Sequence, residues 1–387
     1  MSLREKLGRG GPGAAEDSRR SLFRRYGVTR NPFPPAGEPS GHPHMEVPAE
    51  ARIVDALRNF DRDRTSQVMA IEGTQGVGKT SLLNYYQSEL QAFYEDAGGF
   101  YIIRYYPDPE ASFDGILRRI FQEVHQAGLL AEVGKALSPL DPGARSETLS
   151  LVNSGEVRLV LLSLCRSAKD PTALASTADL AFEWLSGMRV LNRHREALNV
   201  HFRLDTVESK NQALRDMVFC CSHLRLLNGI FLLLDELEKQ DYSLSKTVVL
   251  RYLSAIRALI DALPRHLFLL VALTIEARRR YFGMLPAFAG RLQNVVVLKA
   301  LLSSQEALDL YSFYVEKTRE RAQEEALPGW GTPGNSALLD KRVVGDLFEG
   351  MLQRAKTSGS EGVGHRDFLN ALHLLFGSQM QPAGGSR

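Results

Sequence analysis

Apolar positions follow the periods of helices and strands from Glu46 onward, where short apolar runs alternate with longer amphipathic stretches. Alternation of this kind predicts an α/β fold with a parallel sheet. The predicted strands span residues 67–71, 100–106, 229–234, 267–274 and 295–298. Helices are predicted over residues 49–60, from Gly78 or Lys79 through Leu90, over 113–124 and over 247–263. Residues 229–234 are apolar throughout, as expected for a parallel strand that is buried on both faces.

Two further regions add helices to this core. Residues 130–227 have a mostly helical pattern and predict a helical insertion between the second and third strands of a core that spans residues 46–300. Residues 301–377 predict a helical lid domain, with helices over 305–325, 341–354 and 365–376, and a tail follows over 378–387. Ser303 and Glu306 have the spacing of a capping box at the start of this domain.

The first 45 residues lack a regular apolar pattern and are rich in Gly, Pro, Arg and Ser. They predict a flexible basic arm that becomes ordered near Phe33, where Asn31-Pro32-Phe33 docks it onto the core. The arginines of the arm are Arg19, Arg20, Arg24, Arg25 and Arg30. Such an arm either contacts phosphates or acidic partners or stays a solvated tail, and the sequence leaves both interpretations open.

A glycine-rich segment joins the first strand to the next helix. Its residues, Gly73-Thr74-Gln75-Gly76-Val77-Gly78-Lys79-Thr80, fit the P-loop pattern GxxxxGK[ST]. The glycines let backbone N–H groups turn toward phosphate oxygens, and the helix adds its positive amino-terminal end. We expect Gly73 through Ser81 to bind nucleotide, with Lys79 on the β- and γ-phosphates during catalysis and the Thr80 hydroxyl on Mg²⁺. A chance glycine-rich turn is the alternative, and the flanking strand and helix disfavour it.

Two adjacent carboxylates, Asp235 and Glu236, follow the most apolar strand. A buried parallel strand delivers its last residues to the carboxyl edge of the sheet, where nucleotides bind. Asp235 is therefore expected to hold Mg²⁺ through its water shell, and Glu236 to act as the general base on the attacking water. An ordinary strand end before a solvated helix is the alternative. Glu238 is a weaker candidate, expected at the surface or paired with a partner.

Composition constrains the setting of this chemistry. The 387 residues are 44% apolar, enough for a core without metal or disulfide staples, and 47 basic against 45 acidic residues leave a net charge of only +2. Such a balance neither demands nor excludes nucleic acid. Three cysteines without a paired CxxC fit a reducing cytoplasm, and nine histidines without ligand spacing argue against metals other than Mg²⁺. The apolar runs are too short to span a membrane, and the amino terminus lacks the apolar run of a signal peptide.

With the P-loop and the Leu-Leu-Leu-Asp-Glu run, the chain resembles the AAA+ class of ATPases over about residues 30–377 outside the insertion. It is most similar to initiators of the origin-recognition type and related bacterial ATP-binding proteins. The resemblance implies that Thr274 senses the γ-phosphate and that Arg291 completes the site of a neighbouring subunit. Arg278, Arg279 and Arg280 are rivals for that second role.

The resemblance also implies a nucleotide-sensing arginine in the lid. Gly364-His365-Arg366 matches its setting, with histidine in place of a commoner acidic residue or proline, so Arg366 is the candidate. Each arginine has an alternative role: the run at 278–280 as a solvated face or a patch on DNA phosphates, and Arg291 as a helix cap. Within the insertion, the stretch from Trp184 to Gly187, placed ahead of the acidic strand, resembles the layout of ATP-binding proteins from BREX-type phage-defence systems.

These observations predict a Mg²⁺-dependent ATP-binding and ATP-hydrolysing switch that works in a homo-oligomer or a larger assembly, with DNA as the leading partner and phage defence as one setting. The alternative is a nucleotide-gated scaffold in which hydrolysis is incidental. A small-molecule kinase is disfavoured because the pattern ends in a helical lid.

Overall fold

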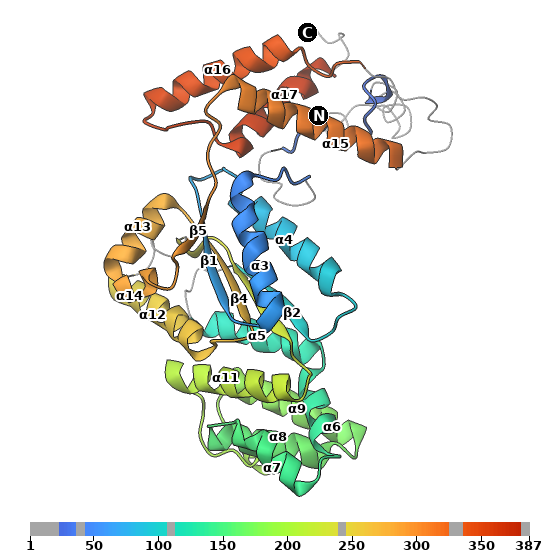
Figure 1. The fold of residues 1–387 in the computed structure, drawn as a ribbon, viewed down its shortest axis with the longest axis vertical. Helices are drawn as coiled ribbons and strands as arrows, with labels where there is room; N and C mark the ends of the chain where they lie inside the picture. Colours follow the sequence, from blue (N-terminus) through green and yellow to red (C-terminus); the bar gives the residue numbers. More distant parts are fainter. Residues whose placement is uncertain (1–22, 36–42, 107–112, 239–244, 325–335, 381–387) are drawn as a thin grey trace, which may run out of the picture. The chain divides into compact units, whose positions relative to one another are not determined.

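The structure is a computed structural model that describes residues 23–35, 43–106, 113–238, 245–324 and 336–380 (Figure 1). It separates into two compact units, each with its own core. The sheet unit comprises Pro48–Glu72 and Leu82–Val297. The lid unit comprises the described residues of Met1–Val47, Gly73–Ser81 and Leu298–Arg387. The glycine-rich loop thus groups with the lid helices, although the chain enters it directly from the first strand.

Five parallel strands form the sheet, in the order β2-β3-β4-β1-β5 (Figure 1). Their bounds are β1 Gln67–Glu72, β2 Phe100–Tyr105, β3 Gly229–Leu234, β4 Leu267–Leu273 and β5 Asn294–Val297. Every residue of β3 and β4 is buried, as their uninterrupted apolar sequences require. All five strands are those predicted from the sequence, and the α/β fold class with a parallel sheet is confirmed.

Helices of the sheet unit alternate with these strands. They are α3 Ala51–Asp63, α4 Lys79–Tyr94, α5 Phe113–Gln126, α12 Lys246–Ala262, α13 Ile275–Met284 and α14 Pro286–Ala289, with a short 3₁₀ turn, η1 Pro48–Glu50, before α3. The predicted helices among them are confirmed within a few residues at each end. The sequence did not predict α13 or α14, because α13 buries only Ala277 and Tyr281 and its three consecutive arginines hide the apolar period.

The predicted helical insertion is confirmed as a set of helices between α5 and β3. It comprises α6 Leu129–Leu137, α7 Pro142–Ser150, α8 Gly155–Ser167, α9 Pro171–Leu185, α10 Asn192–Leu198 and α11 Val207–His223. Side-chain caps fix several starts: Asp141, Ser154, Asp170 and Thr206 each accept hydrogen bonds from the first turn of the helix that follows. Trp184 is fully buried, and the apolar core of the insertion is continuous with that of the sheet.

The helices predicted for the lid are present in the described part of the lid unit as α15 Ser304–Glu324, α16 Lys341–Thr357 and α17 His365–Gln379. The expected capping box is only half present. The backbone N–H of Glu306 donates to the Ser303 hydroxyl at 3.3 Å, but the Glu306 carboxylate accepts from the N–H of Leu302 instead of from that of Ser303. No helix in the described part of the chain is both long and apolar enough to cross a membrane.

The described part of the arm, residues 23–35, packs on the lid helices, which corrects two expectations. Phe33 is 1% exposed and stacks on Tyr311 with ring centroids 5.6 Å apart, so it docks onto the lid and not onto the nucleotide core. Phe23 and Tyr26 also pack against Phe376, so the ordered contacts begin before Phe33. Arg24, Arg25 and Arg30 are exposed, whereas Arg19 and Arg20 lie outside the described residues.

Candidate nucleotide-binding site

The loop from Gly73 to Ser81 has the backbone geometry that its glycines were expected to allow. Gly76 and Gly78 have φ angles of +81° and +101°, a region that side-chain-bearing residues rarely occupy. A Cβ atom on Gly73 would lie 2.8 Å from the carbonyl oxygen of Leu298 and 2.6 Å from Val77 Cγ2. Glycine is therefore required by conformation at two positions of the loop and by close approach at a third.

Lys79 folds back across this loop at the start of α4. Its Nζ donates hydrogen bonds to the carbonyl oxygens of Gly73, at 2.9 Å, and of Thr74, at 3.0 Å. Neutral carbonyl acceptors of the loop thus help to hold the ammonium group over it. Phosphate oxygens carry full charge and form stronger hydrogen bonds, so a nucleotide competes favourably for the same group. Thr80 follows on the first turn of α4, partly buried.

The start of α17 lies directly against the loop, within the same unit. The backbone N–H of Arg366 donates to the carbonyl oxygen of Gly76 at 3.0 Å. A Cβ atom on Gly364 would lie 3.5 Å from the carbonyl oxygens of Gln75 and Gly76. The structure therefore brings the predicted lid arginine to the P-loop, with its side chain exposed.

His365 also lies close to the loop: a Cβ atom built on Gly78 would lie 3.9 Å from the His365 Nδ1. Burial lowers the pKa of His365, and the nearby Glu306 carboxylate opposes that shift. The imidazole is therefore neutral at neutral pH.

The predicted carboxylates directly follow β3. Asp235 is 1% exposed, and its Oδ1 accepts from the backbone N–H of Glu236 at 3.0 Å. Glu236 itself has a φ of +50°, an unusual value for a residue with a side chain and one that concentrates at functional sites. The Asp235 side chain thus stabilises the strained backbone that carries Glu236.

Arg104 on β2 is the functional candidate that the sequence analysis missed. Its Nη2 donates to Asp235 Oδ2 at 2.7 Å, and the two side chains are 5% and 1% exposed. Its guanidinium also lies 4.8 Å from the centroid of the Tyr106 ring. Two other nitrogens, Nε and Nη1, are buried without a hydrogen-bond partner among the described residues. The signal in the sequence was a charged residue inside the strand Phe-Tyr-Ile-Ile-Arg-Tyr, because a buried charge demands a partner.

Thr274 follows β4 and caps α13, where its hydroxyl accepts from the backbone N–H of Ala277 at 3.2 Å. Its own N–H donates to Glu238 Oε1 at 3.1 Å. Glu238 was expected at the surface or on a partner, but it is partly buried and connects the segment after β3 to the end of β4. The proposed γ-phosphate-sensing role of Thr274 remains a prediction.

Strand register brings these groups to one edge of the sheet. β4 lies between β3 and β1, with Leu234 opposite Val271 and Glu72 opposite Leu273. Asp235, Thr274 and the end of β1 therefore lie at the same carboxyl edge, and the P-loop begins with the residue after Glu72. The strand that leads to Thr274, β4, is thus adjacent to β1, and the strand that leads to Asp235, β3, is the next one along the sheet.

The candidate arginines for a neighbouring subunit have partners within this chain. Arg291 Nε lies 2.8 Å from Asp261 Oδ1 on α12, with both side chains more than a third exposed. Arg278 pairs with Glu72 at 2.9 Å and packs over the ring of Phe282. The run at 278–280 is therefore not a uniformly solvated or DNA-facing patch, although Arg279 and Arg280 are exposed.

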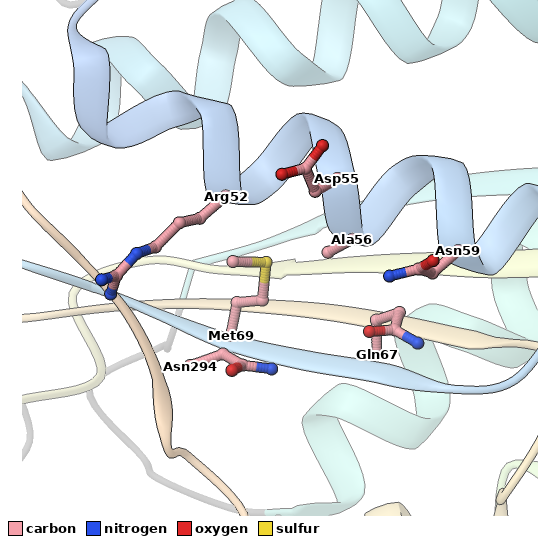
Figure 2. Close-up of a pocket in the computed structure, with 7 residues that line it drawn as sticks. All are labelled: Arg52, Asp55, Ala56, Asn59, Gln67, Met69 and Asn294. Atoms are coloured by element: carbon pink, nitrogen blue, oxygen red, sulfur yellow. The ribbon is translucent and has the colours of Figure 1, made fainter.

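One cavity of about 280 Å³ lies between α3 and the first half of β1 (Figure 2). Its lining residues are Arg52, Asp55, Ala56, Asn59, Gln67, Met69 and Asn294. The guanidinium of Arg52, the one cation of the lining, donates to the carbonyl oxygen of Val295 at 2.9 Å, and the lining also contains the acidic Asp55. The lining lacks the clustered donors that a triphosphate needs.

No protein-family model matches this chain. Two curated proteins named GTPase Der, from Salinispora arenicola and Salinispora tropica, are 34% and 32% identical over 135 residues. The match covers 34% of this chain and 27% of each relative, so the chain spans about a quarter of their length.

The solved structures similar to this chain have low TM-scores. The ORC2 protein of Aeropyrum pernix has a TM-score of 0.37 at 15% identity and covers 91% of this chain and 72% of that one. A Walker-type ATPase of Pyrococcus abyssi has a TM-score of 0.35 at 13% identity, with coverage of 86% and 73%. Cdc6p of Pyrobaculum aerophilum has 0.34 at 14% identity, with coverage of 84% and 66%. The fold assignment therefore rests on the strand order, the register and the glycine-rich loop themselves.

Proposed function

We propose that this chain binds ATP with Mg²⁺ and hydrolyses it as a switch of the AAA+ type. The observation that carries the proposal is the loop itself, where glycine is required at Gly73, Gly76 and Gly78 and Lys79 is held over the loop carbonyls. Backbone that closes in this way between a strand and a helix is suited to binding phosphate oxygens.

The residues present fit a magnesium ion as well as a triphosphate. The Thr80 hydroxyl and the Asp235 carboxylate are oxygen ligands of the kind that Mg²⁺ prefers, directly or through water. When bound, the ion would neutralise charge on the phosphates. Both Asp235 oxygens already accept hydrogen bonds, from Glu236 and Arg104, which favours an interaction through water over direct ligation.

Glu236 is the proposed general base. The hydrogen bond from its backbone N–H to the Asp235 carboxylate holds the backbone that carries this side chain. Thr274 and Arg366 are proposed to report the γ-phosphate to the sheet and the lid, respectively. Opening and closing of these contacts would couple hydrolysis to how subunits or a DNA partner are held, in keeping with the resemblance to origin-recognition-type initiators.

Replacement of Glu236 by glutamine separates the proposed switch from the scaffold alternative. Because the amide cannot accept a proton from water, we expect ATP turnover to fall at least about 100-fold while nucleotide affinity stays within about threefold. Steady-state phosphate release and fluorescent-nucleotide titration measure the two quantities. Unchanged turnover would remove Glu236 from the mechanism, and retained biological activity without turnover would favour the scaffold.

The proposed role of Arg291 makes ATP hydrolysis depend on assembly of several chains. An arginine supplied by a neighbour can accelerate hydrolysis about 1000-fold or more. We therefore expect specific ATPase activity to rise with protein concentration and the Arg291→Ala variant to stay at the dilute rate. Because Arg291 pairs with Asp261 in the single chain, Asp261→Asn is the matched control and should retain the rise. A specific ATPase activity that stays constant with protein concentration in wild type and both variants would reject a role of Arg291 in trans.

The base specificity of the site is best tested with both purine nucleotides. The AAA+ resemblance favours ATP, whereas the curated relatives are named as GTPases, so parallel titrations with ATP and GTP distinguish the two. A setting in phage defence is proposed only from the stretch between Trp184 and Gly187 and its place ahead of β3.

A further inference from the structure

Two loops of the helical insertion expose large apolar side chains. Met188 and Leu191, between α9 and α10, are 46% and 45% exposed, and Phe202, between α10 and α11, is 72% exposed. The loops are joined: Trp184 Nε1 donates to the carbonyl oxygen of Phe202 at 2.9 Å, and Arg203 Nε donates to that of Gly187 at 2.7 Å. These apolar residues are therefore carried by one connected surface.

The backbone of Phe202 is held from both sides. Its N–H and that of His201 donate to Glu156 Oε2, at 3.3 and 2.8 Å, and its carbonyl accepts from the fully buried Trp184. Folding gains little by anchoring the backbone of a phenylalanine whose ring stays in water. The arrangement does, however, reduce the entropy lost when a partner covers the ring.

The other loop is held equally firmly. The N–H of Met188 donates to the carbonyl oxygen of Glu183 at 3.1 Å. The N–H of Leu191 donates to Nδ1 of His194, whose Nε2 lies 2.9 Å from Glu183 Oε2, and the His194 side chain is 1% exposed. Both loops are thus preformed rather than ordered by a ligand.

Exposed arginines lie close to these apolar residues along the chain. Residues 188–203 contain four arginines, no lysine and one acidic residue, Glu196, a balance of +3 in a chain whose total is +2. All four arginines are exposed, and Arg193 is also paired with Glu183. Exposed Met and Phe beside Arg match the residue types enriched where proteins bind each other, while lysine, which is depleted there, is absent.

We propose that this insertion surface, formed by Met188, Arg189, Leu191, Arg195, Phe202 and Arg203, docks an acidic segment of a partner protein whose apolar side chains cover Phe202. Glu156 and Glu183 beside this surface already bond backbone N–H groups, Arg193 and His194, whereas Arg189, Arg195 and Arg203 form no ion pair among the described residues, so their charge calls for carboxylates on the partner. A nucleic acid would use Phe202 for stacking but would leave Met188 and Leu191 without a complement, so protein is favoured. The surface is in the insertion, and the inference stands apart from the proposed nucleotide chemistry.

Selection from a random 16-residue peptide library displayed on phage tests this proposal, with the full chain as bait. Phe202→Ser is the test variant, and Phe93→Ser is the matched control because Phe93, on α4, is 73% exposed. We expect wild type and Phe93→Ser to enrich peptides that combine Asp or Glu with apolar residues, and Phe202→Ser to lose them. Equal thermal midpoints would establish that the three proteins are folded alike.

A synthetic selected peptide then gives the magnitude. Its Kd is expected to rise about 30-fold or more for Phe202→Ser, the loss typical of an aromatic hot spot, and to rise for Arg195→Glu. A peptide with its acids changed to lysine should not bind. Failure to select acidic peptides overturns the proposal. The proposal is also overturned if Phe202→Ser weakens the binding of a 20-nucleotide oligo-dT but not that of the peptides, which would assign the surface to nucleic acid. An oligomer of the wild type that dissociates in Phe202→Ser would assign it to a second copy of the chain.

Discussion

Asp235→Asn is expected to destabilise the folded chain by about 3–5 kcal/mol, beyond any effect on metal binding. The change leaves the Arg104 guanidinium buried without the carboxylate that compensates its charge. The asparagine oxygen can still accept from the Glu236 N–H, so the loss should come mainly from the ion pair. Urea unfolding of the variant and the wild type, followed by far-UV circular dichroism, measures the difference.

The double variant Asp235→Asn/Arg104→Met is the critical control, because it removes both charges. We expect it to be more stable than Asp235→Asn alone, since no buried charge then lacks a partner. Asp55→Asn removes an equivalent acid from the Arg58 pair, whose side chains are 75% and 68% exposed, and should cost less than about 1 kcal/mol. An Asp235→Asn protein as stable as wild type would show that the Arg104 pair does not stabilise the fold.

Lys79→Ala is expected to weaken Mg-ATP binding by about 30-fold to 1000-fold or more, corresponding to roughly 2–5 kcal/mol for the loss of one partner of a charged hydrogen-bonded pair. The same ammonium also donates to the loop carbonyls of Gly73 and Thr74, so the variant should lose a small amount of stability. Titration with a fluorescent ATP analogue at saturating Mg²⁺ measures the affinity.

Lys356→Ala provides the matched control for this prediction, because Lys356 is an exposed lysine on α16 in the same unit. Its affinity should equal that of the wild type. If Lys79→Ala and Lys356→Ala bind the nucleotide equally well, Lys79 does not contact the phosphates and its two carbonyl hydrogen bonds are structural.

Features that depend on neighbouring residues were predictable from the sequence. The five strands are predominantly apolar or β-branched runs, and the P-loop is a pattern of eight consecutive residues, two of whose glycines meet local backbone needs. Asp235 and Glu236 were identifiable because they end the most apolar strand. Each of these signals lies within one element and its boundary.

Features that depend on distant partners were not predictable. Arg104 and Asp235 are 131 residues apart, and β2 and β3 become neighbours only when the sheet forms around the intervening insertion. The prediction of where the arm docks was wrong for the same reason, since the carbonyl of Phe33 accepts a hydrogen bond from His373, 340 residues away. Glu238 was expected at the surface or on a partner. Its hydrogen bond from Thr274 joins two segments that lie 36 residues apart, so the sequence alone did not indicate its partly buried position.

Isothermal titration calorimetry of the full chain with ATP in the presence of Mg²⁺ measures nucleotide binding without a label. We expect saturable binding of one nucleotide per chain, strongly weakened in Lys79→Ala. No heat and no displaceable binding with either ATP or GTP, from protein shown to be folded, would contradict the proposed nucleotide binding.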